Sequence, residues 1–376
     1  MKIILKKTDE QIALIQAMAS KDRSVAMEAQ DAFAAFMGPT LAKVVFNAPV
    51  LSNMFTSITV NEDDNASIPM DLYYNITDHN FVRVWSQTAA GGLGYSEMVP
   101  TTAEMKVATY NISTAYAFDR KYIAKSRLDV VSKGLQWIAE ELLNKQESMS
   151  AGPVFSSLAA ASTNGKAHVQ RGNAADRFTL ADLNELLTLA RRVNTSFNKG
   201  TPATAQSRGV TDLLISPEMA EEVRAMAYNP INTKEAPYSS ALKDSIPATD
   251  AMRTAIFNAA GLPSFYGITL IELNEFGVGA KYNTVFDVAA GSTNYSRPDG
   301  STGAAAFDGT TTELLLGIDR SRDSLIRILT TDGNSEISFE ADTQFSKRGS
   351  NKIGFAGGYD EGRVCLDDRV LFGKLI

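Results

Sequence analysis

Residues 110–142 read YNISTAYAFDRKYIAKSRLDVVSKGLQWIAEEL, and two periodicities within this stretch decide the fold class. In its first part, aromatic and β-branched residues occupy alternate positions and so share one face of a predicted strand. In its second part, apolar residues recur at spacings of three and four, which predicts an amphipathic helix over residues 127–150. The strand face is Tyr110, Ile112, Thr114, Tyr116 and Phe118, and the helix stripe is Leu128, Val131, Leu135, Ile138 and Leu142. The stretch therefore predicts a fold that contains both strands and helices.

The residues before Ser57 predict a helix. Thr8 and Gln11 have the spacing of a capping box, and a helix-compatible stretch runs on to Met37, where Gly38-Pro39 should end it. The stretch is rich in Ala and Met, and its apolar stripe is incomplete. We therefore expect it to dock on another surface as an arm and not to form a core.

A long hairpin is predicted between this helix and the strand at 110–118. Residues from Ser57 onward have a sequence pattern typical of strands. A glycine-rich stretch at 91–94 precedes the returning strand. Because two isolated strands are only marginally stable in water, such a hairpin needs a neighbouring surface to lie on.

The second half of the chain predicts a region that mixes strands and helices. Thr179 should open a helix, and residues 211–215 read as a buried strand that runs into Ser216-Pro217-Glu218, the start of another helix. Residues 293–312 read as a turn-rich insertion. A further helix is expected near 251–260, and strands at 268–273, 314–317, 324–329, 335–339, 363–366 and 369–376.

Composition narrows the functional classes. The formal net charge of −7 disfavours a protein that reads nucleic-acid sequence, since the molecule as a whole repels phosphate. Cys365 is the only cysteine, which excludes an internal disulfide and fits folding in a reducing cytoplasm. No apolar run approaches the roughly 18 to 20 residues needed to cross a bilayer. The first residues also lack the apolar run of a signal peptide, so secretion is not indicated.

The residue types that usually carry catalysis are scarce. His79 and His168 are the only histidines, and with one cysteine a four-ligand Cys/His zinc site cannot be assembled. The glycines at 91–94 lack the spacing of a phosphate-binding loop, and the acidic residues at 62–64 lack the pattern of a calcium loop. The adjacent residues Asp367-Asp368 should point apart, which argues against paired catalytic carboxylates. We therefore expect no cofactor, no metal and no enzyme activity.

The densest basic cluster is Arg120, Lys121, Lys125 and Arg127, directly before the predicted helix. Such a cluster can be a solvated face, can bind the acidic surface of a partner, or can hold DNA without sequence preference. The sequence leaves these interpretations open.

The order of these parts resembles the major capsid proteins of tailed bacteriophages, which have the Hong Kong 97-like fold shared with encapsulin compartments. One local match, Leu214-Ile215-Ser216-Pro217-Glu218, is similar to the strand-to-helix entry of the family's axial domain. The closing segment is the other match, through Phe345-Ser346-Lys347-Arg348, Lys352-Ile353-Gly354-Phe355, Gly362-Arg363-Val364 and Asp367-Asp368-Arg369-Val370. The resemblance spans nearly the whole chain and implies an α+β fold and a structural subunit that tiles a closed shell.

The resemblance implies a sequence of regions along the chain. They are an N-terminal arm at 1–55, an E-loop region at 56–125, a peripheral domain with its spine helix at 126–177, an axial domain at 178–330 and a return to the peripheral domain at 331–376. The E-loop is the family's extended hairpin, and its tip would lie near Gln87–Pro100. No lysine occurs between Ile68 and Ala103, so the cross-linking of subunits through an E-loop lysine that some members show is not supported.

The function that the resemblance implies is self-assembly into hexamers and pentamers, which form an icosahedral phage head around double-stranded DNA. The virion would be assembled in the bacterial host cytoplasm. Further implied partners are a portal, a separate scaffolding protein and a decoration protein, with DNA contacted non-specifically and no membrane. Residues expected at contacts between subunits are Phe33, Phe36, Met37, Trp85, Leu93, Tyr95, Tyr110, Ile112, Tyr116, Phe118, Arg120, Lys121 and Arg127.

Two alternatives stay open. An encapsulin-like nanocompartment would share the fold and differ in holding a protein cargo. A fibrous or tail-tube phage protein would share the β-rich, cysteine-poor texture, but it should lack the helix that contains Leu128–Leu142.

Overall fold

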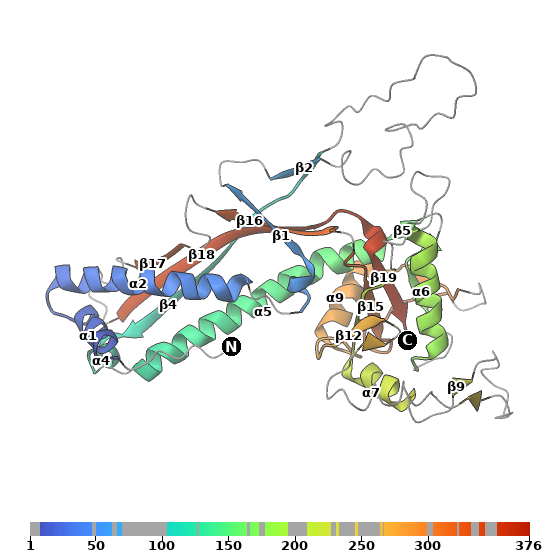
Figure 1. Cartoon of the computed structure of the whole chain (residues 1–376), viewed down its shortest axis with the longest axis horizontal. Helices are drawn as coiled ribbons and strands as arrows, with labels where there is room; N and C mark the ends of the chain where they lie inside the picture. The colour runs from blue at the N-terminus through green and yellow to red at the C-terminus, as the bar shows by residue number, and fades with distance from the viewer. Residues whose placement is uncertain are drawn as a thin grey trace, which may run out of the picture. The chain divides into compact units, whose positions relative to one another are not determined.

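The fold is that of a computed structural model of the chain (Figure 1). It describes residues 8–46, 50–61, 66–69, 104–125, 128–163, 166–172, 177–194, 209–226, 231–232, 245–246, 264–265, 267–298, 304–321, 323–331, 338–342 and 352–376. The chain divides into two compact units. Unit 1 comprises Met1–Ile68, Glu104–Ser150 and Leu325–Val364, and unit 2 comprises Pro69–Ala103, Ala151–Ser324 and Cys365–Ile376.

Unit 1 is built on a five-stranded sheet around the long strand β18 (Lys352–Cys365). Strands β4 (Tyr110–Asp119) and β17 (Ser338–Asp342) both pair with β18 in antiparallel fashion. Strand β16 (Leu325–Thr331) follows in the sheet order, and β1 (Thr56–Asn61) pairs parallel with it at the edge. The predicted strand at 110–118 is thus confirmed, but it belongs to this sheet and not to a free hairpin.

The alternation predicted for β4 is confirmed as well. Ile112 and Phe118 are buried, whereas Ser113 and Ala115, which point to the other face, are exposed. Ile112 lies opposite Tyr359 of β18, which is also buried. One face of the sheet therefore supplies the core of unit 1.

The helices α1 (Asp9–Met18), α2 (Arg23–Phe46) and α5 (Leu128–Ala160) contribute to this core. Ile15, Met18, Phe33 and Met37 are at most 3% exposed. Burying each such side chain contributes about 1.5–3 kcal/mol, so the four together approach the net stability of a whole domain. The expectation of an arm that forms no core is therefore wrong for these residues.

The predicted ends of these helices also need correction. Residues 8–37 form two helices, because Asp22 caps α2 by accepting a hydrogen bond from the Ser24 backbone N–H at 3.2 Å. Helix α2 continues through Gly38-Pro39 to Phe46, and α5 continues through Pro153 to Ala160. A proline removes one helical hydrogen bond, and in α5 the fully buried Val154 and Phe155 directly after it offset that loss.

Unit 2 is built on a six-stranded mixed sheet in the order β11-β12-β8-β15-β19-β7. Its strands are β7 (Val169–Arg171), β8 (Asp212–Ile215), β11 (Ser264–Phe265), β12 (Ile268–Glu272), β15 (Leu314–Ile318) and β19 (Leu371–Leu375). The strands β8, β15 and β19 are buried along their whole length. The last strand of the chain thus lies in the sheet of unit 2, whereas β18 lies in the sheet of unit 1.

Helices cover the sheet of unit 2. Helices α6 (Leu180–Asn194) and α7 (Pro217–Met226) pack on the face that carries Leu213 and Leu315. The last turns of α5 and helix α9 (Lys281–Ala290) form a second cluster, in which the Phe155 ring lies 5.5 Å from Tyr282 and 6.2 Å from Phe286. Thr179 and Ser216 begin α6 and α7 as predicted, and the Ser216 hydroxyl accepts a hydrogen bond from the Met219 backbone N–H at 3.0 Å.

The remaining elements are short. They are η1 (Ser52–Met54), β2 (Ser67–Pro69), β3 (Glu104–Lys106), α4 (Arg120–Ala124), β5 (Ser162–Thr163), β6 (Lys166–Ala167), β9 (Ile231–Asn232), β10 (Ser245–Ile246), β13 (Asn294–Tyr295), β14 (Ala305–Ala306) and η3 (Asp368–Val370). The helix predicted near 251–260 lies outside the described residues. The stretch at 293–312 contains only β13 and β14 among its described residues, as its turn-rich sequence predicts.

Candidate assembly surfaces

Where β4 pairs with β18, the face of the unit 1 sheet that points away from its core carries small side chains. Ala115 of β4 lies opposite Ala356 of β18, and Ser113 lies opposite Gly358. Ser113, Ala115 and Ala356 are exposed, and Gly358 is half-buried. Such short side chains leave the sheet nearly flat, so an extended segment could approach it closely.

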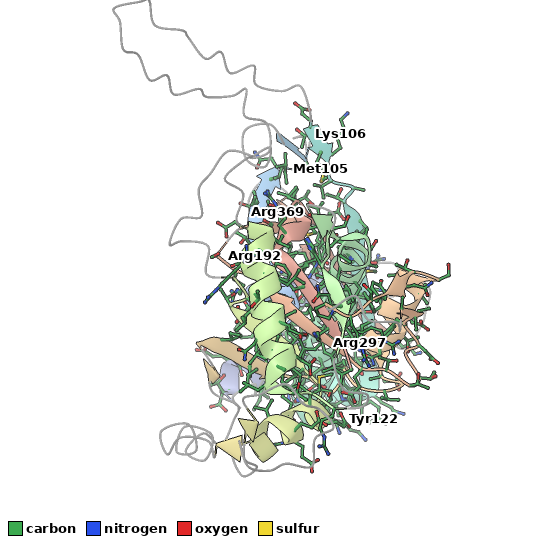
Figure 2. The ribbon with its side chains drawn as sticks, turned by 90° about the vertical axis from the view of Figure 1, so that its right-hand side faces the viewer. Met105, Lys106, Tyr122, Arg192, Arg297 and Arg369 are labelled. Carbon is green, nitrogen blue, oxygen red and sulfur yellow. The ribbon has the colours of Figure 1, made fainter. Side chains whose placement is uncertain are left out.

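The base of a hairpin leaves unit 1 beside this sheet. Strands β2 and β3 pair with each other, and the Val107 backbone N–H donates to the Ala66 carbonyl oxygen at 2.9 Å. Met105 and Lys106 lie on β3 (Figure 2). The connection between these strands, residues 70–103, lies outside the described residues, as do the predicted contact residues Trp85, Leu93 and Tyr95.

Four of the predicted contact residues belong to the core of unit 1. Phe33, Met37, Ile112 and Phe118 are buried, and the Phe355 ring lies 5.3 Å from Phe33 and 6.3 Å from Phe118. Side chains buried within their own chain offer no surface to a second subunit. The interpretation of these four as contact residues is therefore corrected to a core role.

Arg120 also serves its own chain. Its guanidinium donates hydrogen bonds to the Ala19 carbonyl oxygen at 3.2 and 3.3 Å, and to the carbonyl oxygen of Ser20. These carbonyls end α1, where a helix has unsatisfied acceptors and a partial negative charge. Arg120 therefore holds α1 against α4.

Other predicted contact residues reach the surface of unit 1. Phe36 is 50% exposed on α2, and Lys121 is exposed on α4, with its ammonium 3.9 Å from the Asp119 carboxylate. Tyr110 and Tyr116 are half-buried. These four stay predictions, and Arg127 lies outside the described residues.

Large exposed side chains that sequence reasoning missed lie on α4 and on α5. Trp137 is 52% exposed, although it lies within the helix whose stripe predicted the core. Val130 and Tyr122 are also large and exposed, and Tyr122 lies at the surface in Figure 2. The Lys133 ammonium lies 5.3 Å from the Trp137 ring centre, and that of Lys121 lies 4.9 Å from the Tyr122 ring centre. The signal available in the sequence is a tryptophan that lies off the apolar stripe.

Unit 1 contains a buried group of charges. The Glu361 carboxylate accepts hydrogen bonds from Arg327 at 2.9 Å and from Arg363 at 3.1 Å, and all three side chains are at most 2% exposed. The Tyr110 hydroxyl donates to the same carboxylate at 3.0 Å. Burial, and next the negative charge of Glu361, raise the pKa of Tyr110 above its ordinary value and that of Tyr359 to about 12. Both tyrosines therefore stay protonated and act as hydrogen-bonding groups.

Several buried ionisable groups of unit 2 have partners within the same unit. The Lys374 ammonium is buried, 2.5 Å from the Glu185 carboxylate and 3.5 Å from that of Asp182. Burial raises the pKa of the Glu313 carboxyl, which accepts a hydrogen bond from the Ser216 hydroxyl at 2.9 Å. Burial also raises the pKa of the Cys365 thiol to about 12, which keeps it from being a reactive thiolate.

His168 is buried, and its ring stacks on Phe372 at 5.3 Å between centres. Its Nδ1 lies 3.1 Å from the carbonyl oxygens of Asp368 and Leu371. His79 lies outside the described residues. Over the part of the chain that the structure describes, no group of three or more His, Cys, Asp or Glu side chains could hold a metal ion, and no helix is long and apolar enough to cross a membrane.

No protein-family model and no curated protein sequence matches this chain, but solved structures do. The capsid structure of the cyanophage P-SCSP1u is similar over 87% of this chain and 88% of that chain, with a TM-score of 0.50 and 12% sequence identity. The chain has the fold of a capsid protein. The resemblance inferred from the order of its elements is thus confirmed at the level of the fold.

Other solved structures are similar to this capsid-protein fold. They include a structure from Microbacterium phage Oxtober96, at 12% identity over 88% of this chain and 90% of that chain, with a TM-score of 0.46. The capsid of Ralstonia phage GP4 is 14% identical over 87% of both chains, with a TM-score of 0.47. Because a fold does not by itself fix a function, what the chain does is argued separately.

Proposed function

We propose that this chain is the shell-forming subunit of a bacteriophage capsid. The observation that carries the proposal is the likeness to the cyanophage P-SCSP1u capsid structure, which extends over 87% of the chain and so includes both units. A subunit of this kind works by burying surface against copies of itself, and we assign it no catalytic role.

The surfaces of unit 1 support this proposal. A hairpin base leaves the unit, and a two-stranded hairpin is marginally stable until it lies on another surface. The flat face with Ser113, Ala115 and Ala356 could receive such a segment from a second copy. The exposed Trp137 adds an aromatic side chain of the kind that dominates binding energy at protein interfaces.

The finer features belong to the same proposal. The subunits would form hexamers and pentamers that close into an icosahedral head around double-stranded DNA, in a virion assembled in the bacterial cytoplasm. Phe36, Tyr110, Tyr116 and Lys121 would lie at or near the contacts between subunits. A portal, a separate scaffolding protein and a decoration protein would be the other partners, and DNA would be contacted non-specifically, in keeping with the net charge of −7.

Electron microscopy of the purified chain, alone and co-expressed with its neighbouring genes, tests the proposal. We expect closed icosahedral particles, or hexameric and pentameric rings. A chain that stays monomeric under all these conditions would overturn the proposal. Particles that hold a protein cargo and exclude DNA would instead identify an encapsulin-like compartment.

A narrower test concerns the predicted E-loop. Deleting Gln87–Pro100 should abolish shells or lower their thermal stability, because the hairpin would lose the area that it buries on a neighbour. Deleting residues 301–303, in the turn-rich stretch, is the control and should leave the shells unchanged. Shells of unchanged stability after the first deletion would refute the assignment of the E-loop.

A further inference from the structure

Three consecutive residues of β18, Glu361, Gly362 and Arg363, contact the chain on both sides of the hairpin base. The outgoing leg is defined here as residues 51–61, which lead through β1 toward β2. The returning leg is residues 104–110, which lead from β3 into β4. Both legs and β18 up to Val364 belong to unit 1, so their contacts are contacts within one compact body.

Arg363 holds the outgoing leg. Its guanidinium donates a hydrogen bond to the Ser52 hydroxyl at 2.7 Å and lies 5.4 Å from the centre of the Phe55 ring. The same guanidinium donates to the hydroxyl of Ser150. The Glu147 carboxylate also fixes the outgoing leg, because it accepts hydrogen bonds from the backbone N–H groups of Leu51 at 2.8 Å and Ser52 at 3.0 Å. The outgoing leg is thereby fixed by both backbone and side-chain bonds immediately before β1 begins.

Glu361 and Gly362 hold the returning leg. The Tyr110 hydroxyl donates to the Glu361 carboxylate at 3.0 Å. Gly362 lies so close to the leg that an added Cβ would be 2.8 Å from the Val107 side chain and 2.9 Å from the Ala108 carbonyl oxygen. Real Cβ atoms are not found at such distances from backbone atoms. Only glycine therefore lets the returning leg pass over β18 along this path.

The buried charges make this arrangement stiff. Glu361 is fully buried between Arg327 and Arg363, and Arg327 lies on β16, the strand that pairs with β1. Removing one member of such a group leaves an uncompensated charge without water, which is strongly unfavourable. The group therefore resists being taken apart, and both legs contact it.

We infer that Glu361, Gly362 and Arg363 form a clamp that fixes the roots of both legs and so sets the direction in which the hairpin leaves unit 1. The inference rests on the proposed function, because the direction of the hairpin matters only if the hairpin must reach a neighbouring subunit. The three residues are positioning residues: they act through the hairpin and need not touch the neighbour.

Single-group substitutions test each leg of the unassembled, full-length subunit by hydrogen exchange and mass spectrometry. Tyr110→Phe and Gly362→Ala should speed exchange in residues 104–110, and Ser52→Ala should do so in residues 51–61. For each lost hydrogen bond to a charged group we expect about a tenfold increase in exchange rate. Tyr116→Phe, which changes another tyrosine of β4, is the matched control and should leave both legs unchanged. Unchanged exchange in Tyr110→Phe and Gly362→Ala would overturn the clamp.

Assembly of the same variants separates the clamp from the proposed function. If the wild-type chain forms shells, Gly362→Ala and Tyr110→Phe should form fewer or irregular ones, while circular dichroism shows the subunits to be folded. Faster exchange together with normal shells would overturn the positioning role and leave the proposed function standing. A wild-type chain that never assembles would overturn the proposed function, whatever the exchange shows.

Discussion

His168 belongs to a residue type that often carries catalysis, but its surroundings give it a structural role. Carbonyl oxygens can only accept hydrogen bonds, so the Nδ1 atom beside Asp368 and Leu371 must carry the proton. Burial lowers the pKa of His168, and this outweighs the opposing effect of the Asp368 carboxylate. The neutral imidazole therefore packs on Phe372 as a flat, hydrogen-bonded side chain.

We predict that His168 makes the chain less stable in mild acid. Its folded-state pKa lies below the ordinary value of 6.5, so the unfolded chain binds the proton more readily. Stability present above about pH 6.5 is therefore lost as the pH falls below that value. His168→Asn keeps a side-chain N–H but cannot become charged, so its thermal unfolding midpoint should fall less steeply in acid. Parallel pH profiles of the wild type and the variant would contradict this prediction.

Lys374 should matter for stability far more than an exposed lysine. Lys374→Met leaves the fully buried Asp182 carboxylate without its cation, which we expect to destabilise the fold by about 3–5 kcal/mol. Adding Asp182→Asn should restore part of that loss, because the buried charge is then gone. Lys121→Met is the control: its pair with Asp119 is exposed and contributes under about 1 kcal/mol. Denaturant unfolding measures all three, and equal losses for both lysines would refute the argument.

At the scale of elements, helix α5 contains two glycines in opposite surroundings. A Cβ added at Gly134 would lie 2.9 Å from the Tyr116 ring and 3.0 Å from the Phe118 ring, so this glycine lets the helix approach β4. A Cβ at Gly152 would meet no atom within 4 Å apart from those of its chain neighbours, one of which is Pro153. The first glycine is required by the packing of α5 on β4. The second precedes Pro153, whose ring would crowd the Cβ of any other residue at this helical position.

Alanine at these two positions should therefore change stability by different amounts. Gly152→Ala should change the free energy of unfolding by less than about 1 kcal/mol, because the lower conformational entropy of the unfolded state opposes the crowding of the new Cβ by the Pro153 ring. Gly134→Ala should destabilise it by about 1–3 kcal/mol through overpacking against the two rings. The midpoints of denaturant unfolding, followed by circular dichroism, check both. A stabilising Gly134→Ala would mean that α5 does not pack closely on β4.

Elements with local signals were predictable, and those decided by distant partners were not. Ser216-Pro217 predicts the start of α7 from capping chemistry alone, and the alternation in 110–118 predicts β4. The prolines at 39 and 153 predict helix ends that packing overrides. Nothing local indicates that β1 pairs parallel with β16, since the two strands lie almost at opposite ends of the chain.

For the whole molecule, the order of elements pointed to the fold, but the sequence did not show which apolar faces meet a second subunit. Periodicity predicts that Phe33, Ile112 and Phe118 are buried, and they are. Periodicity does not show what buries them, because the core of the same chain and a contact with a neighbouring subunit bury the same types of side chain. Trp137 is not among the predicted contact residues, because it lies off the apolar stripe and faces water.

Trp137 offers a direct test of assembly at this scale. Besides Trp85 it is the only tryptophan, so Trp85→Phe leaves it as the single reporter of tryptophan fluorescence. We predict that its emission shifts to shorter wavelength when shells form, because a half-exposed ring becomes buried at a contact between subunits.

In the wild-type background, Trp137→Ala should weaken assembly more than the loss of an ordinary exposed apolar side chain. Truncating an aromatic hot spot costs about 2 kcal/mol or more per contact, and every subunit of a closed shell repeats that loss. Val288→Ala is the control, because Val288 is 81% exposed and isolated apolar side chains at a surface are ordinary. Light scattering against protein concentration gives the threshold for assembly, which should rise for Trp137→Ala alone. Equal thresholds for the two variants, with an unshifted Trp137 emission, would place this face of α5 outside the contacts between subunits.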